Sequence, residues 1–562
     1  MNYPSRSDDT ELHPDWNQNP QDLNSDATTR ADLNGIVNLR EAREHRSDPH
    51  NDDQDQIDSN DQHCDEDGIG TRQPRSKGDI SVPAGPGIES TSAPKSYGSK
   101  IKDGLIKYAQ FVGPGFLIAV AYIDPGNYAT DVEAGASTKY RHLFIVLMSN
   151  LFAIFLQSLC IKLGSVTGLN LAENCRKHLP RWLNLVLYVL AEAAIIATDI
   201  AEVIGSAIAL NLLFHIPLVA GCAITIVDVL ILMIFWSPDG SMRRLRLFEF
   251  CVMGLVLGVM VCFCIQLSYI HNTSAGEVFR GYLPSAAIIK GDGIYLSCGI
   301  LGATVMPHSL FLGSGIVQPR LRHFDETNGL QRFTPPPAMA PTNASNSDAE
   351  KYLPSLEAIR SCLTYSIIEL STSLFTFALF VNSAILIVAG SALYPSTEAT
   401  EADLFGIHAL LSSSVSKVAG TLFALALLLS GTSAGIVCTM AGQMVSEGML
   451  NWRCKPWVRR LVTRSISIIP SIVVAAAVGK EGLNRALTAS QVVLSVILPF
   501  VSAPLVWFTC RSKIMSVMTR EQEHETINMR NGWVAAGFAI AIWLVLVVMN
   551  VALLVLVGLG KA

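Results

Sequence analysis

Long apolar segments, separated by polar connections, follow one another from about residue 111 to the end of the chain. A helix needs about 20 mostly apolar residues to cross a bilayer. This requirement predicts eleven spans, at 111–133, 142–165, 183–210, 216–236, 248–270, 293–317, 361–390, 417–449, 462–478, 487–510 and 531–558. The pattern therefore predicts an all-α, multi-pass membrane protein, with an eleven-helix domain over 101–562.

The first span is interrupted by Asp124-Pro125-Gly126-Asn127. An Asp at the centre of a membrane helix costs about 2.5–3.5 kcal/mol on insertion scales. Pro125 removes an intrahelical hydrogen bond and Gly126 frees the backbone, so a regular helix is not expected to continue here. An open backbone at membrane depth is tolerated only where it is buried in protein or lines a wet cavity. The stretch predicts a broken helix with a carboxylate at the break, as in an ion site.

The sixth span is interrupted as well, by Met306-Pro307-His308. Five spans separate the start of the first broken span from the start of the second. Interrupted segments at corresponding positions of two halves are the sequence sign of an inverted repeat with its binding site near the bilayer midplane. Ten helices in two halves of five, plus one extra helix, predict the LeuT-like architecture with helices 1 and 6 broken.

Side chains at the two breaks suit a divalent transition metal ion. Asp124 offers a hard anionic oxygen, Asn127 a neutral oxygen and Met306 a thioether sulfur. Unwound backbone would add the carbonyls of Ala121 and Ala303. Calcium and magnesium gain nothing from sulfur, whereas manganese, iron, cobalt and cadmium tolerate or prefer it. The alternative is that Met306 only fills space in the core.

Ionisable residues in other spans predict a proton path that leads away from this site. Glu192, Asp199 and Glu202 fall within an arc of roughly 80° on the third span. Three carboxylates on one membrane-helix face are costly unless they line a wet path or meet cations. The predicted path comprises Asp124, His308, Glu202, Asp199, Glu192 and Arg464. A static ion-pair network, with His308 as a hydrogen-bonded structural histidine, is the alternative.

Two amides in later spans are weaker candidates. Gln491 in the tenth span could give an oxygen to the metal in one conformational state, although hydrogen bonding between helices is the commoner role of such a residue. Asn382 in the seventh span is a candidate gate residue, with packing as the alternative.

Composition and charge agree with a membrane protein and add its orientation. The chain is 50% hydrophobic and only 16% charged, against roughly 25% in soluble domains. Lys and Arg concentrate before the first span and in the even-numbered connections, which predicts a cytoplasmic N-terminus. The polar residues 1–100 predict a disordered tail, available to trafficking machinery, and 319–358 a flexible cytosolic loop. The sequon at Asn272 then falls in a loop on the non-cytosolic side and could be glycosylated, whereas the sequon at Asn343 falls in a cytosolic loop and should not be.

Two further classes of site are not indicated. The 12 cysteines form no CxxC pair and no disulfide framework. A basic nucleic-acid footprint is absent from the sequence. The expected partners are therefore the lipid bilayer, a divalent metal ion and protons, with no permanent cofactor and no nucleic acid.

The stretches IDPGNYATD, ATVMPHSLF and TDIAEVIGSAIALNLL closely resemble the natural resistance-associated macrophage protein (Nramp) family, over about residues 105–560. The wording of the third span and the long acidic tail resemble the fungal branch, whose members import manganese and iron. The resemblance implies a LeuT-like fold and proton-coupled symport of Mn²⁺, Fe²⁺ and related ions such as Cd²⁺ and Co²⁺ toward the cytosol, across a plasma, endosomal or vacuolar membrane. It also implies metal-binding roles for Asp124, Asn127, Met306, the carbonyls of Ala121 and Ala303 and, in some states, Gln491. Many members carry a second histidine in the sixth span where this chain has Gly313.

Two other functions remain alternatives at this point. One is a membrane sensor that binds metal without transporting it. The other is a LeuT-like symporter of an amino acid with a cation, in which Met306 would only pack. An intramembrane metalloenzyme is disfavoured because the chain has no HExxH motif.

Overall fold

The structure is a computed structural model that describes residues 112–225, 242–270, 273–330, 332–333, 352–394, 404–451, 456–477, 479–518 and 526–559. The predicted tail over 1–100 lies outside these residues, as do both sequons at Asn272 and Asn343. The predicted span 216–236 is described only as far as residue 225.

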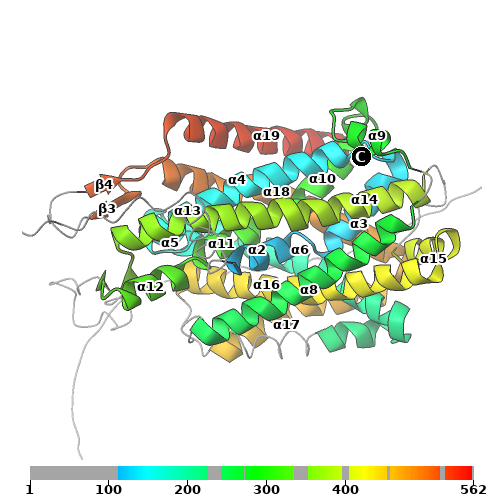
Figure 1. Cartoon of the computed structure of the whole chain (residues 1–562), viewed down its shortest axis with the longest axis horizontal. Coiled ribbons are helices and arrows are strands. Elements are labelled where there is room, and N and C mark those ends of the chain that lie inside the picture. Colours follow the sequence, from blue (N-terminus) through cyan, green and yellow to red (C-terminus); the bar gives the residue numbers. More distant parts are fainter. Residues whose placement is uncertain are drawn as a thin grey trace, which may run out of the picture. The chain divides into compact units, whose positions relative to one another are not determined.

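Long helices make up most of the described chain. They are α4 (Leu143–Thr167), α6 (Arg181–Phe214), α8 (Met242–Ser268), α13 (Leu356–Ser373), α14 (Leu379–Ala392), α16 (Lys417–Leu450), α17 (Pro456–Ala477), α18 (Gly479–Cys510) and α19 (Trp533–Gly558). A π-helical turn, Leu374–Ala378, joins α13 to α14. Figure 1 shows α4, α14 and α19 running lengthwise, with β3 and β4 near one end of these helices and α9 near the other.

Shorter elements connect or interrupt the long ones. The short helices are α2 (Pro114–Ala121), α3 (Pro125–Thr138), α5 (Leu171–His178), α9 (Ala275–Gly281), the 3-10 turn Ala286–Ile288, α10 (Gly293–Thr304), α11 (Pro307–Gly315), α12 (Gln318–Thr327) and α15 (Leu404–Ser414). The strands are β1 (Arg332–Phe333), β2 (Tyr352–Leu353), β3 (Ser516–Met518) and β4 (Thr526–Asn528), which form two antiparallel hairpin-like pairs.

Within the described ranges, eight helical segments are long and apolar enough to cross a membrane. The prediction of a helical, multi-pass membrane protein is confirmed, with two short strand pairs added to the helices. The count of eleven spans and the cytoplasmic position of the N-terminus stay predictions.

Both predicted helix breaks are present. The first broken helix stops at Ala121 and resumes at Pro125, and the second stops at Thr304 and resumes at Pro307. Each second half begins with proline, whose fixed φ and missing N–H suit the first position of a helix. Asp124 caps α3, because its carboxylate accepts the N–H groups of Gly126 and Asn127 at 3.1 and 2.9 Å.

Glycines let neighbouring backbones approach the two breaks. A Cβ at Gly205 of α6 would lie 2.2 Å from the Pro125 ring, and one at Gly302 of α10 would lie 2.1 Å from the carbonyl oxygen of Gln491. Real Cβ atoms do not approach so closely. The long helices α6 and α18 are therefore packed directly against the interrupted segments.

The predicted flexible loop over 319–358 is wrong at both of its described ends. Residues up to Thr327 belong to α12, and Leu356 begins α13. Asp325 is fully buried and accepts hydrogen bonds from the hydroxyl of Tyr352 at 2.6 Å and from the backbone N–H of Ser355 at 2.9 Å. One buried carboxylate thus holds the two ends of the connection together.

Candidate functional site

The two breaks meet at Asn127. Its side-chain Nδ2 donates to the carbonyl oxygen of Ala303 at 3.1 Å, which joins the first broken helix to the second. The same nitrogen donates to Asp124 Oδ1 at 2.6 Å and to the carbonyl oxygen of Tyr122 at 3.3 Å. Three oxygens from residues at the two breaks therefore converge on the Asn127 side-chain nitrogen. An arrangement of this kind suits a cation.

A second carbonyl of the first break lies at the site, and the role of the Ala121 carbonyl stays a prediction. In the first break, the carbonyl that reaches Asn127 is that of Tyr122, one residue after Ala121. The chain tightens at the end of α2, where the N–H groups of Tyr122 and Ile123 bond three residues back, each at 3.1 Å. This 3-10-type ending places the Tyr122 carbonyl where Asn127 can donate to it.

Asn382 lies at the same site, from α14. Its Nδ2 donates to the Tyr122 carbonyl at 3.0 Å and lies 3.5 Å from Asn127 Oδ1. The predicted gate residue therefore holds the first break in its unwound form. Its own Oδ1 is buried and has no hydrogen-bond partner among the described residues.

Met306 occupies the break of the second helix. It is the N-cap of α11, it is 1% exposed, and its carbonyl accepts the hydroxyl of Ser309 at 2.8 Å. Asp124 and Asn127 are 0% exposed. The predicted ligands are thus shut away from solvent in this conformation.

Gln491 of α18 lies directly beside Asp124. A Cβ added to Gly126 would be 2.1 Å from the Gln491 side-chain nitrogen and 2.8 Å from Asp124 Oδ2. Only a glycine leaves room for both side chains. The Gln491 Oε1 is buried without a hydrogen-bond partner in the described part of the chain, so this oxygen is available to a ligand.

The predicted proton path starts at a contact between α11 and α6. His308 is 1% exposed, and its Nδ1 lies 3.4 Å from the hydroxyl oxygen of Thr198. Asp199, the next residue, and Glu202 are each 2% exposed. Glu192 is half-buried farther back along α6, and the side chain of Arg464 lies outside the described residues. The structure therefore brings His308 close to the acidic face of α6.

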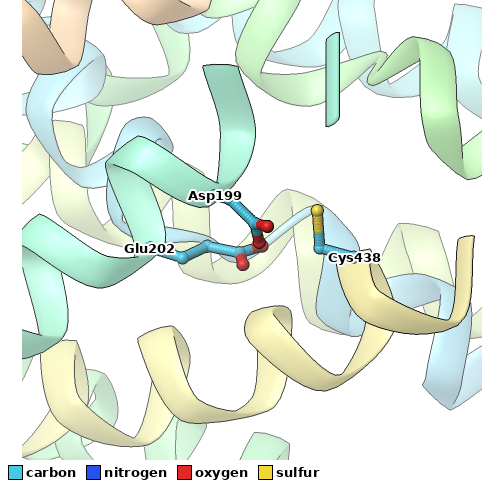
Figure 2. Close-up of side chains that lie close together, drawn as sticks. All are labelled: Asp199, Glu202 and Cys438. Carbon is cyan, nitrogen blue, oxygen red and sulfur yellow. The ribbon is translucent and has the colours of Figure 1, made fainter. Parts of the chain in front are cut away.

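Cys438 lies close to the carboxylates of Asp199 and Glu202. Ligand-type atoms of Asp199, Glu202 and Cys438 all lie within 4.8 Å of one another. Figure 2 shows the two carboxylates side by side on α6, facing the sulfur of Cys438 on α16. Cys438 could not be assigned to this group from the sequence, because 236 positions separate it from Glu202 (438 minus 202). The cluster places a polarizable thiol on the predicted path.

A glutamine of α4, Gln157, forms hydrogen bonds to residues at both breaks, and it was not predicted as a site residue from the sequence. Gln157 Nε2 donates at 3.0 Å to the hydroxyl of Tyr122, the hydroxyl of Ser309 and the carbonyl of Ser309. Tyr122 lies in the first break and Ser309 just after the second. A lone glutamine in an apolar span could have been flagged as a helix–helix contact, although its partners could not.

Asp131 is a further buried carboxyl group that the sequence reading left out. It is 0% exposed, and neither of its oxygens has a hydrogen-bond partner among the described residues. It follows Asp124 by seven positions, which puts the two residues on the same face of α3. That spacing of acidic residues was the available signal.

Gln157 also explains why glycine occupies position 313. A Cβ at Gly313 would lie 1.9 Å from Gln157 Oε1. The Gln157 amide therefore fills the space that a histidine side chain would need at position 313.

We expect Gly313→Ala to destabilise the protein by about 1–3 kcal/mol, because overpacking a tight interior displaces neighbouring groups. The melting temperature of the purified protein measures this effect. Adding Gln157→Ala to the same chain should relieve the clash, so the double variant should lose less stability than the sum of the losses of the two single variants. The matched control is Gly254→Ala in α8, where a Cβ would meet nothing within 4 Å. Equal melting temperatures for the two single variants would contradict the packing argument.

A buried carboxylate accepts hydrogen bonds from the backbone at the start of α2. The carboxylate of Glu369 accepts the N–H groups of Gly113 and Gly115 at 2.9 and 2.8 Å. Beside it, Arg320 pairs with Glu249 at 3.2 Å. These contacts hold the first half of the broken helix against α13 and α8.

The C-terminal end of α3 is in direct contact with α14. A Cβ at Gly135 would lie 2.7 Å from the carbonyl of Leu386 and 2.9 Å from the N–H of Gly390. Beyond it, Lys139 pairs with Glu277 of α9 at 2.8 Å. The candidate site is therefore enclosed between two sets of contacts, one on each side.

Comparisons with known proteins identify the family to which the chain belongs. The family model described as natural resistance-associated macrophage protein-like (Nramp) matches residues 115–556. The chain is 54% identical over 471 residues to the manganese transporter pdt1 of Schizosaccharomyces pombe, covering 83% of this chain and 88% of that protein. It is 52% identical to the iron transporter SMF3 of Saccharomyces cerevisiae, covering 74% and 84%. A crystal structure of the Eremococcus coleocola manganese transporter, bound to an aromatic bis-isothiourea substituted compound, superposes with a TM-score of 0.63 at 30% identity, covering 82% and 88%. The chain therefore belongs to the Nramp family.

Proposed function

We propose that this protein carries divalent transition metal ions, Mn²⁺ and Fe²⁺ and also Cd²⁺ and Co²⁺, toward the cytosol together with protons. Relatives named as manganese, iron and divalent metal cation transporters support metal transport by this chain, which is a transporter and not an enzyme. Coupling to protons and the direction of transport are our own proposals. The observation that carries the proposed metal site is the convergence of Asp124, Tyr122 and Ala303 oxygens on Asn127.

The donor set favours a transition metal over calcium or magnesium. Rotating the Asn127 amide by half a turn would turn its oxygen, in place of its nitrogen, toward the three oxygens to which the nitrogen now donates. The four oxygens would then face one another and could surround a cation. A cation there would meet the carboxylate of Asp124, backbone carbonyls and an amide oxygen. Met306 at the facing break would add sulfur, which hard ions do not use and softer divalent ions do.

Proton transfer is proposed to run from the metal site along His308 and α6. Histidine changes charge within the physiological range, and its ring lies within reach of Thr198 beside Asp199. The buried carboxylates of Asp199 and Glu202 give a proton an onward route. If the same groups formed only a static ion-pair network, their loss would lower stability without changing the pH dependence of uptake.

The closed conformation fits an alternating-access cycle. The proposed ligands are buried, with Glu369 holding α2 on one side and Gly135 packed against α14 on the other. Opening either set of contacts alone would connect the site to one side of the membrane. Two gates that open in turn are what a secondary transporter requires.

The deciding experiment is uptake by the purified full-length protein in sealed vesicles. We expect Mn²⁺ uptake that increases when the outside is made acidic, competition by Fe²⁺ and Cd²⁺, and little competition by Ca²⁺. Saturable metal binding without uptake would instead support the sensor alternative. Sodium-dependent uptake of an amino acid, without metal uptake, would support the amino acid symporter.

His308→Ala is expected to flatten the pH dependence of metal uptake. Over the pH range in which acidification speeds uptake by the wild type, the variant should respond much less than the wild type does. Uptake rates measured across this range test the proposal. His408→Ala, in α15, is the matched control and should keep the wild-type profile. An unchanged profile in His308→Ala would remove this residue from the proton path.

A further inference from the structure

A polar cavity of about 780 Å³ lies away from the two helix breaks. It is formed where α4 and α16 end, α6 begins and α5 and β2 pass between them. Its lining comprises Thr167, Leu169, Glu173, Arg176, Lys177, Arg181, Asn184, Leu185, Tyr352, Leu353, Met449, Leu450 and Asn451. Nothing in the proposed transport cycle uses this cavity.

Three cations converge on the cavity from one short stretch of chain. Arg176 and Lys177 are in the last turn of α5, and Arg181 is the first residue of α6. None of the three forms a salt bridge within the part of the chain that the structure describes. Glu173, the acidic residue of the lining, accepts the backbone N–H of Asn170 at 2.8 Å in a capping box.

Helix electrostatics accounts for only two of these cations. Positive charge stabilises a helix C-terminus, so Arg176 and Lys177 are well placed for the structure of α5. Arg181 is at a helix N-terminus, where positive charge is unfavourable. A bound anion beside Arg181 would reverse that penalty.

The first turn of α6 offers hydrogen-bond donors to such an anion. Pro180 precedes the helix and supplies no side-chain cap. The first intrahelical bond of this end runs from the Asn184 N–H to the Pro180 carbonyl, at 3.0 Å. Uncapped N–H groups at the start of a helix are an anion-binding arrangement.

A buried amide adds an acceptor to the cavity wall. The Asn184 Nδ2 donates to the Met449 carbonyl at 3.1 Å. Asn184 is 8% exposed, and its Oδ1 is buried without a hydrogen-bond partner among the described residues. This oxygen could accept a hydrogen bond from a hydroxyl or amine that accompanies the anion.

The cavity opens beside an apolar surface that faces outward from the helices. Along the first part of α6, Trp182 is 67% exposed, Leu185 54% and Val189 58%. Leu185 also lines the cavity. A tryptophan next to cations, followed by exposed aliphatic residues, is typical of the boundary between lipid headgroups and acyl chains.

The charge of the membrane surface agrees with this placement. The cavity lies in the second connection, one of those whose Lys and Arg residues predict the cytosolic side. Anionic lipids are concentrated in the cytosolic leaflet, and basic pockets between membrane helices bind their headgroups.

We propose that this cavity binds the phosphorylated headgroup of an anionic phospholipid. The phosphate lies against Arg176, Lys177, Arg181 and the free N–H groups of α6, and the acyl chains follow Leu185 and Val189. A bound headgroup would link α5 and the start of α6 to the end of α16.

The test measures lipid binding to the purified full-length protein in neutral detergent. A phosphatidylinositol phosphate is titrated against phosphatidylcholine, and the shift of the melting temperature gives an apparent Kd. We expect saturable binding of the phosphatidylinositol phosphate and no saturable binding of phosphatidylcholine. The triple variant Arg176→Gln, Lys177→Gln, Arg181→Gln should weaken it by about a hundredfold, as expected for three cations at an anionic surface.

A charge-matched control separates a site from general attraction. Arg511, Lys513 and Arg530 are exposed on the same predicted side and do not line the cavity. Replacing these three by glutamine should leave the Kd within about twofold of wild type. Equal weakening in both triple variants, or none in the first, would overturn the site. Soluble inositol bisphosphate that bound as tightly as the lipid would overturn the assignment to a membrane lipid.

Discussion

Replacing Asp124 by alanine is expected to abolish metal uptake. Asp124 supplies the anionic oxygen among the groups that converge on Asn127, and it also caps α3 through Gly126 and Asn127. Losing a carboxylate ligand removes more than the 10- to 100-fold that outer-shell partners of a metal contribute, so uptake should fall by at least about a hundredfold. The measurement is initial Mn²⁺ uptake by reconstituted protein at saturating external metal.

Asp124→Asn separates charge from shape. The amide oxygen of asparagine can still accept the N–H of Asn127, since asparagine is a good N-cap. We therefore expect this variant to keep the melting temperature of the wild type within a few degrees and yet to lose uptake as the alanine variant does. Uptake close to wild type in Asp124→Asn would mean that the ion does not need this charge.

Glu133→Gln is the matched control for Asp124. Glu133 is on the same helix, but its carboxylate accepts the hydroxyl of Thr488 at 2.9 Å on α18 and does not point to the breaks. Loss of one negative charge here should leave uptake nearly unchanged. A loss as large as that of the Asp124 variants would show that any charge removed from α3 disables the protein, and the central site would lose its support.

The sequence was most informative where the signals are local. Asp124-Pro125-Gly126 and Met306-Pro307 each end a helix by chemistry that acts within a few residues, so both breaks could be placed before any tertiary contact was known. The meeting of Asn127 with Ala303 followed from the matched positions of the breaks in two halves. The location of Asp124, Asn127 and Met306 in one buried region was therefore predictable.

Features that depend on distant residues were not predictable. The carbonyl that Asn127 contacts at the first break is that of Tyr122, because packing decides how the last turn of α2 tightens, and helix ends vary by one or two residues for such reasons. Gln157 and Cys438 each contact a partner more than a hundred positions away, Ser309 and Ile195 respectively. The ends of the 319–358 connection are ordered through Asp325, whose bonds to Tyr352 and Ser355 cross a polar stretch that resembles a linker.

Met306→Ala is expected to change metal preference more than any other single substitution. Thioether sulfur interacts strongly with soft ions and hardly at all with Ca²⁺. Removing it should lower the affinity for Cd²⁺ by about tenfold and for Mn²⁺ by less, with Ca²⁺ binding unchanged or improved. Equilibrium binding of the three ions to purified protein, followed by competition in the uptake assay, measures the change.

Two controls separate the sulfur from the space that it fills. Met306→Leu keeps an apolar side chain of similar size without sulfur, so it should lose Cd²⁺ affinity as the alanine variant does while keeping the stability of the wild type. Met444 of α16 packs beyond the break, where a Cβ at Gly315 would lie 2.7 Å from its sulfur. Met444→Ala should therefore lower stability with no effect on ion preference. If Met306→Leu retained wild-type Cd²⁺ affinity, or if Cd²⁺ and Ca²⁺ weakened equally, Met306 would be a packing residue, and Asp124, Asn127 and the backbone carbonyls alone would have to account for selection of the metal.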